Sequence, residues 1–189
     1  MASRLVLASA SPRRKSLLAQ IGITPDAITP ADIDEAPRRD ELPRPHALRL
    51  AEEKADAVHK AGQFTLSADT VVGVGRRILS KTEDENSARN CLSLMGGRSH
   101  HVYTGVCLLG PDGQRSVKVS DTRVKVKRLT AEEIDHYIAS KEWDGKAGGY
   151  AIQGLFESHI ISIQGSYSGV VGLPLYTVQN MLSGMGYRS

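Results

Sequence analysis

The sequence predicts a mixed α/β protein, because segments with a strand pattern and segments with a helix pattern alternate along the chain. Short runs rich in β-forming residues predict strands at 4–8, 64–72 and 98–109. Apolar residues spaced three and four apart predict helices, with a clear example at 45–61. A chain of 189 residues has the length of one domain, so we expect a single domain over 1–189 that buries a substantial core.

The first predicted strand leads into a helix that carries two misplaced charges. Ser11 occupies an N-cap position and Pro12 the first helical position, and the helix is expected to end at Gly22. Arg13 and Arg14 fall at the positive end of the helix dipole, where free N–H groups attract anions. Two interpretations remain open: both arginines are solvated surface charges, or they bind a phosphate group.

The next elements contain two more charges of interest. A brief strand at 26–29 precedes an acidic loop at 31–37, which carries Glu35 and is by default a solvated turn. In the helix at 45–61, Lys54 lies on the apolar face. It is either a lysine whose ammonium snorkels to water or a phosphate ligand.

The strand at 64–72 contains Asp69, although aspartate is disfavoured in strands and costly to bury unpaired. A structural salt bridge would explain it. A carboxylate that binds a metal or activates water is the interpretation we favour. A return strand at 77–79 then places Lys81 near the start of the following helix, for which Thr82 and Glu85 predict a capping box.

The second half of the chain continues with strands and helices. The strand at 98–109 turns back at 111–113, and the valines of the return strand change parity, which predicts a bulge or a break near 120–121. The remaining expected elements are, in order, a helix capped by Thr130 and Glu133, a flexible loop at 144–149, strands at 150–153 and 158–163, and a final helix after Pro174.

The composition narrows the function classes. Hydrophobic residues make up 40% of the chain and charged residues 24%, which is typical of a globular protein. The net charge of +3 gives no reason to expect binding of a nucleic acid polymer. Cys91 and Cys107 lack metal-ligand spacing and are expected to be reduced, buried thiols. Without an apolar run long enough for a membrane span, a cytoplasmic protein with no membrane partner is expected.

The charged residues point to phosphoryl chemistry. The P-loop and dinucleotide-binding patterns are absent from the sequence, and its histidines lack metal-ligand spacing. Four cations suit a polyphosphate, namely Arg13, Arg14, Lys54 and Lys81. Two carboxylates suit Mg²⁺ or Mn²⁺, namely Glu35 and Asp69. Spacing alone does not show that these six residues converge.

Seven segments occur in a characteristic order. They are ASASPRR at 8–14, DIDE at 32–35, SADTVV at 67–72, ILSK at 78–81, HVYTGV at 101–106, KAGGYAIQG at 146–154, and GSY followed by VGLPL between 165 and 175. This set resembles the Maf family of nucleoside-triphosphate pyrophosphatases over nearly the whole chain. The resemblance implies an α/β fold shared with inosine-triphosphate pyrophosphatases, a mixed, curved β-sheet flanked by helices, with two lobes and a central cleft.

The resemblance also implies an activity. The reaction would convert a nucleoside triphosphate to the monophosphate and pyrophosphate, through a metal-activated water that attacks the α-phosphorus, with Mg²⁺ or Mn²⁺ as cofactor. Family members are often dimers, so a homodimer is expected. A 7-methyl-GTP pyrophosphatase is one alternative, and a nucleotide-responsive interaction protein in septum formation and cell division is another.

The resemblance assigns roles to individual residues. Catalysis would involve Asp69, Lys54 and Lys81, substrate binding Ser9, Arg13, Arg14, Thr70 and Gln153, and metal binding Glu35 and Asp69. The match at Arg13, Thr70 and Gln153 is to the subfamily that acts on dTTP and UTP, with CTP as a further substrate. A carboxamide such as that of Gln153 can both donate to and accept from the edge of uracil or thymine.

Overall fold

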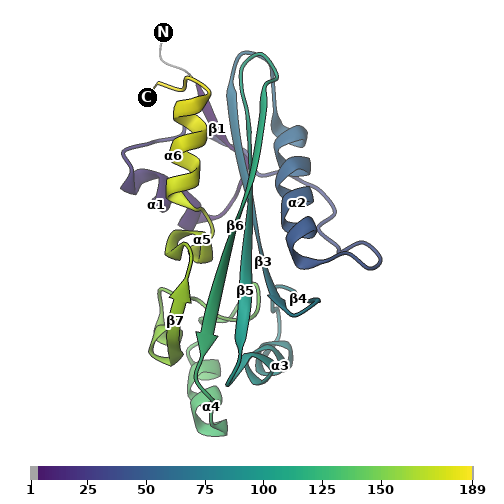
Figure 1. Ribbon diagram of the computed structural model, residues 1–189, viewed down its shortest axis with the longest axis vertical. Coiled ribbons are helices and arrows are strands. Elements are labelled where there is room, and N and C mark those ends of the chain that lie inside the picture. The colour runs from purple at the N-terminus through teal and green to yellow at the C-terminus, as the bar shows by residue number, and fades with distance from the viewer. Residues whose placement is uncertain (1–3, 189) are drawn as a thin grey trace.

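The computed structural model describes residues 4–188, which form a mixed sheet flanked by helices (Figure 1). In chain order the elements are β1 (Leu5–Leu7), α1 (Pro12–Gln20), β2 (Ala27–Ile28), α2 (Pro43–Val58), β3 (Phe64–Val74), β4 (Arg77–Leu79), α3 (Glu85–Met95), β5 (Ser99–Leu109), β6 (Arg115–Val126), α4 (Ala131–Ala139), the 3₁₀ helix η1 (Leu155–His159), β7 (Ile160–Gln164), α5 (Tyr167–Val171) and α6 (Leu175–Gly184). The predicted α/β class is confirmed.

Within these residues the seven strands run in the order β2-β1-β3-β5-β6-β7, with β4 paired to β3 beside this path. β1 is parallel to β2 and β3, and the other neighbours are antiparallel. The long strands β3, β5 and β6 run along the molecule, and the first strand β1 and the last helix α6 lie near the top of Figure 1.

Two hydrophobic clusters occupy opposite ends of the long strands. One joins β1, α1 and α6 to the first half of β3, and its buried members include Leu7, Leu18 and Leu66. The other joins β4, α3, α4 and η1 to the far half of the same strands, through residues such as Val72 and Phe156. The sheet therefore connects two lobes, as expected from the resemblance.

α2 covers the opposite face of the sheet from α1 and α6 (Figure 1). Its small residues Ala51 and Ala55 pack against Cys107 and Leu109 of β5. A Cβ atom on Gly105 would stand 2.2 Å from the carbonyl oxygen of Ala47. The backbone of α2 thus approaches β5 more closely than any side chain at position 105 would allow.

One edge of β3 is left open in its middle. β1 pairs with Phe64 to Leu66, and β4 pairs only from Val72 onward. Between these points neither strand covers the edge. Because side chains alternate along a strand, Asp69 points toward α2 and Thr70 toward α5. This opening between the two lobes is where a cavity forms.

Most boundaries agree with the sequence, but the start of α3 does not. The predicted capping box of Thr82 and Glu85 is wrong, since Asp84 is the N-cap and accepts a hydrogen bond from the N–H of Ser87. The Thr82 hydroxyl instead donates to the carbonyl of Trp143 at 2.8 Å. This distant partner leaves Thr82 outside the helix. Thr130 and Glu133 do form their predicted capping box.

The predicted bulge near Ser120 and Asp121 is also wrong. β6 pairs with β5 without interruption from Arg115 to Lys125. The valines change parity because the strand buries opposite faces at its two ends. Val117 packs beneath α2, while Val124 packs in the cluster on the other side. The pairing of β6 does shift register at Lys125 and Val126, against β7.

Three further expectations need correction. Residues 150–153 form an irregular turn rather than a strand, and η1 follows directly. The strand predicted at 158–163 begins only at Ile160 as β7. Cys107 is buried as expected, but Cys91 is only partly so.

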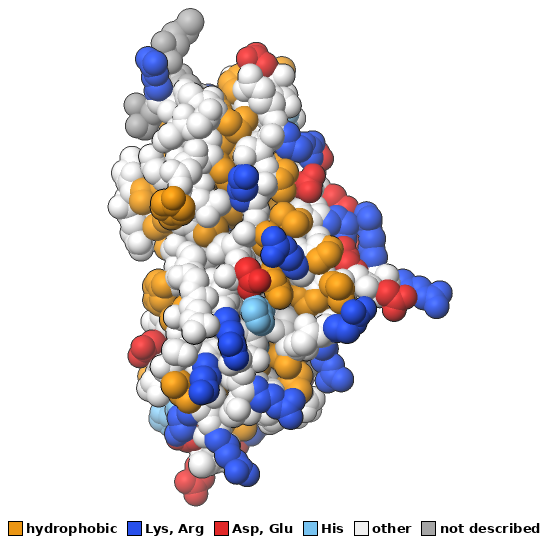
Figure 2. All heavy atoms as spheres, in the orientation of Figure 1, with side chains coloured by type: hydrophobic (Ala, Val, Ile, Leu, Met, Phe, Trp, Pro, Cys, Tyr) orange, Lys and Arg blue, Asp and Glu red, His pale blue; other side chains and the backbone are white. Residues whose placement is uncertain are grey.

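The surface is mixed in charge. The face seen in Figure 2 carries Lys and Arg side chains at many scattered points, with Asp and Glu side chains among them. Among the described residues, every helix is too short or too polar to cross a membrane.

Candidate active site

A cavity of about 370 Å³ lies at the open edge of β3. Residues from both lobes form its wall, including the turn between β1 and α1 and the segment before η1. The structure brings together in this wall all the residues that the sequence assigned to the site: Ser9, Arg13, Arg14, Glu35, Lys54, Asp69, Thr70, Lys81 and Gln153. Their individual roles stay predictions.

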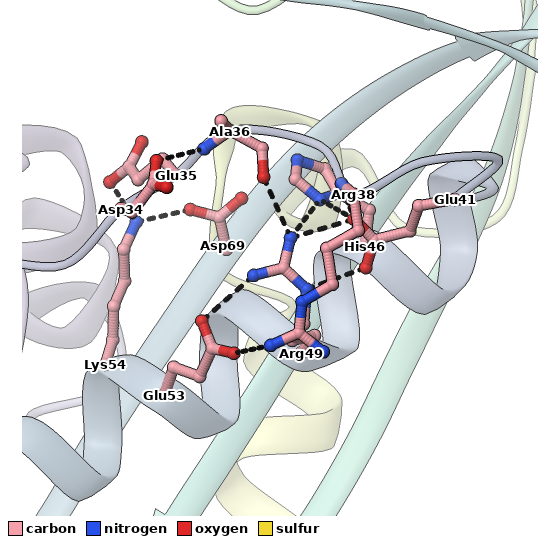
Figure 3. Close-up of polar contacts among 10 residues, drawn as sticks. All are labelled: Asp34, Glu35, Ala36, Arg38, Glu41, His46, Arg49, Glu53, Lys54 and Asp69. Atoms are coloured by element: carbon pink, nitrogen blue, oxygen red, sulfur yellow. Dashed lines mark hydrogen bonds and ion pairs between the residues drawn. The ribbon is translucent and has the colours of Figure 1, made fainter.

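Two carboxylates meet at one ammonium group in this wall (Figure 3). Nζ of Lys54 lies 2.6 Å from Oε1 of Glu35 and 2.5 Å from Oδ1 of Asp69. The Lys54 side chain is 8% exposed, so the ammonium does not reach open solvent as a snorkelling lysine would. Asp69 therefore does form the salt bridge that would explain its burial, and it also lines the cavity.

Glu35 is bound from a second side as well. Its Oε2 lies 2.6 Å from Nζ of Lys81, which is half-exposed. Burial alone would raise the pKa of Glu35, but the hydrogen bonds and charges of Lys54 and Lys81 outweigh it and hold the pKa at about 2. Glu35 is thus an anion at neutral pH.

The two arginines that follow Pro12 have different surroundings. Arg14 donates to the carbonyl of Gly172 at 2.8 Å, to the Ser9 hydroxyl at 2.9 Å and to the Thr70 hydroxyl at 3.4 Å. It therefore joins the turn after β1 to the junction of α5 and α6. The Arg13 side chain makes no hydrogen bond or ion pair with another described residue, and burial lowers its pKa. Of the two, Arg13 is the one available to an incoming anion.

The start of α1 adds backbone donors. Ser11 is the N-cap, but its side chain makes no capping hydrogen bond. The N–H groups of the first turn after Pro12, which itself has no N–H, are therefore not capped by this side chain. The surface charge alternative for Arg13 and Arg14 does not describe this site, because both are at least half-buried and both line the cavity. A helix N-terminus with a partly buried arginine is a suitable place for a phosphate group.

Gln153 reaches the cavity from a turn that the sequence did not predict. Oε2 of Glu142 accepts a hydrogen bond from the N–H of Leu155 at 2.8 Å. The same oxygen lies 2.0 Å from the place where a Cβ atom on Gly154 would stand. Glycine at 154 therefore lets Glu142 hold the turn that presents Gln153.

The polar residues of the wall that the sequence did not assign to the site include Lys146 and Tyr150. Burial and the charge of Arg13 lower the pKa of Lys146, which lies in a loop paired with Lys81 and Thr82. The Tyr150 hydroxyl is 2.8 Å from Nε2 of the buried His100. The sequence offered one signal for Lys146, a single lysine shortly before the glycine pair at 148–149. No feature of the neighbouring sequence indicated that Tyr150 would line the cavity.

The donor set is suited to a divalent cation that is shared with a substrate. Across residues 4–188, no three His, Cys, Asp or Glu side chains gather into a metal-binding group. Glu35 and Asp69 nevertheless converge on Lys54, and Mg²⁺ is commonly held by one or two carboxylates together with substrate phosphates. The residues present thus fit such a metal.

Known proteins resemble this chain over nearly its full length. A family model described as "Maf-like protein" matches residues 4–185. A Caulobacter vibrioides protein named dTTP/UTP pyrophosphatase is 59% identical, covering 97% of this chain and 96% of its own. A Paramagnetospirillum magneticum protein of the same name is 56% identical, with 97% of each chain covered.

A solved structure shares the fold. The HAM1 protein from Coxiella burnetii aligns with a TM-score of 0.53 and 13% identity, covering 96% of this chain and 99% of that one. At this identity the likeness concerns the fold alone. The family model and the two relatives carry the assignment: this chain belongs to the Maf-like protein family.

Proposed function

We propose that the protein hydrolyses dTTP and UTP to the nucleoside monophosphate and pyrophosphate. The observation that carries this proposal is the pair of carboxylates held by Lys54 in a cavity that further cations line. The names of the relatives in Caulobacter vibrioides and Paramagnetospirillum magneticum support the same substrates.

The cations are suited to hold the triphosphate. Arg13, Lys81 and the first turn of α1 offer charge and donors to the phosphate oxygens. Arg14 fixes the wall through its bonds to Ser9, Thr70 and Gly172, and its charge adds to the same potential. Together they would neutralise charge as it spreads over the phosphates in the transition state.

Glu35 and Asp69 would hold the divalent metal. Bound there, Mg²⁺ or Mn²⁺ supplies charge neutralisation and lowers the pKa of a coordinated water. Lys54 keeps the two carboxylates close together despite their mutual repulsion, because its ammonium lies within 2.6 Å of both.

Asp69 is the residue that would prepare the water. Its carboxylate accepts a proton while the water oxygen forms a bond to the α-phosphorus. The bond from the α-phosphorus to the bridging oxygen of the β-phosphate breaks, and pyrophosphate leaves with that electron pair. The proton then passes from Asp69 to solvent.

Base selection is assigned to Gln153. Its amide can donate to a carbonyl and accept from the N–H of uracil or thymine, and a base with another edge would leave these groups unpaired. Apolar wall residues Ala151, Ile152 and Val170 would contact the base itself.

The test is pyrophosphate release from dTTP, UTP, CTP and 7-methyl-GTP with added metal. We expect dTTP and UTP to be the best substrates, and Gln153→Ala to reduce that preference. Gln179→Ala, an exposed glutamine on α6, is the matched control and should leave the ranking unchanged. If 7-methyl-GTP is the best substrate, or if Gln153→Ala keeps the wild-type ranking, the proposal is wrong.

A further inference from the structure

The loop that carries Glu35 is closed by a residue outside the cavity wall. Arg49 of α2 donates from Nη2 to the carbonyl of Ala36 at 3.1 Å. It also forms a two-pronged ion pair with Glu41, with Nε to Oε1 at 2.7 Å and Nη2 to Oε2 at 2.8 Å. One guanidinium therefore binds both ends of the segment 36–41 (Figure 3).

Glu41 is the centre of this contact. Its Oε2 also accepts the backbone N–H of Arg38 at 2.9 Å and lies 2.8 Å from Nδ1 of His46. The hydrogen bonds from Arg49 outweigh burial and hold the pKa of Glu41 at about 2, so it stays ionised at neutral pH. Both Glu41 and Arg49 are largely buried, with side chains 9% and 14% exposed. This two-pronged geometry is the strong form of an arginine–carboxylate pair.

The same helix presents both the clamp and the partner of Glu35. Arg49 lies about one and a half turns before Lys54 on α2. Ala36, which Arg49 holds, is the residue directly after Glu35. Glu35 itself is only half-buried and belongs to a segment without regular secondary structure. The position of its carboxylate over Lys54 therefore depends on what fixes the loop.

We propose that Arg49 is a positioning residue, which holds the segment 36–41 against α2 so that the Glu35 carboxylate stays beside Lys54 and Asp69. Arg49 acts through Ala36 and Glu41, since it does not line the cavity itself. The catalytic part of this inference rests on the proposed pyrophosphatase activity, whereas the structural part concerns the loop alone.

Two variants test the clamp. Arg49→Lys keeps the positive charge but loses the planar fork that bonds Glu41 and Ala36 together. Glu41→Gln keeps the shape of the side chain and removes its charge. Arg115→Lys is the matched control, because Arg115 also pairs with two carboxylates of α2, Glu52 and Asp56, yet does not touch the loop.

Amide hydrogen exchange provides a readout that is independent of activity. In Arg49→Lys and Glu41→Gln we expect the peptide spanning 31–41 to exchange several-fold faster, with β3 and β5 unchanged. In the kinetic assay with dTTP and Mg²⁺, kcat should fall about tenfold to a hundredfold, as misplacement by 1 Å does, with less change in KM. The control should match wild type in both measurements.

The outcomes separate the two claims. Wild-type exchange in the loop, or wild-type kcat in both variants, would overturn the positioning role. If Arg49→Lys speeds amide exchange in the whole sheet, the exchange of Glu41→Gln decides between the two explanations. Faster exchange throughout the sheet in Glu41→Gln as well would also overturn the positioning role. If the wild-type protein fails to hydrolyse any of the four nucleotides, the proposed function fails while the exchange result still judges the clamp.

Discussion

Replacing Gly105 by alanine should disturb the site from the face of the sheet that α2 covers, which is also the face of Asp69. Gly105 pairs with Asp69 across β5 and β3, and its new Cβ atom would stand 2.2 Å from the carbonyl oxygen of Ala47 on α2. Ordinary contact begins near 3.4 Å, so the helix must retreat by roughly 1 Å. Lys54 lies about two turns after Ala47 on the same helix and would move away from Asp69.

The expected cost has two parts. Overpacking of this kind destabilises a protein by about 1–3 kcal/mol, which urea unfolding at neutral pH would measure. A shift of about 1 Å in Lys54 should lower kcat for dTTP by about a hundredfold. Gly184→Ala is the control, because no atom lies within 4 Å of its new Cβ. Wild-type stability together with wild-type kcat in Gly105→Ala would show that α2 does not set the geometry of the site.

Three further predictions follow from the same structure. Asp69→Asn should lower turnover of dTTP by about two to four orders of magnitude, and near-normal turnover in a folded variant would exclude Asp69 as the base. Gly154→Ala places its Cβ 2.0 Å from a Glu142 oxygen, so the turn carrying Gln153 should shift and the preference for dTTP over CTP should fall about tenfold, as competing substrates would reveal. Burial lowers the pKa of His100 from 6.5 to about 4, so the unfolded chain alone takes up that proton as the pH falls between these values. Stability should therefore fall by on the order of 3 kcal/mol across this range, and urea unfolding of His100→Gln should lack that component.

Local signals located most elements of the fold. These signals depend on neighbours within a few residues. Examples are Pro12 at the start of α1, the capping box of Thr130 and Glu133, and the left-handed Gly22. The capping box predicted for Thr82 was wrong because the Thr82 hydroxyl donates to the carbonyl of Trp143, which lies 61 residues away in the chain. A pattern in sequence cannot reveal which of two partners a hydroxyl will choose.

The sequence singled out most of the charged residues that line the cavity, but not their geometry. The charges were visible because each broke a local rule, as Asp69 does in a strand and Lys54 on an apolar face. Their convergence depends on the open edge of β3, which no window of sequence displays. Arg49 escaped notice for the opposite reason, because an arginine beside glutamates on a helix is ordinary.

The long strands also bear on how the chain folds. β3 contributes Leu66 to one hydrophobic cluster and Val72 to the other, so each cluster depends on the strand that the other helps to order. The pairing of β1 with β3 joins residues nearly sixty positions apart, and such non-local contacts slow folding. We expect the two ends to be lost together in one cooperative transition. A destabilising substitution in either cluster should therefore lower the population of the whole native state, including the cavity between the two clusters.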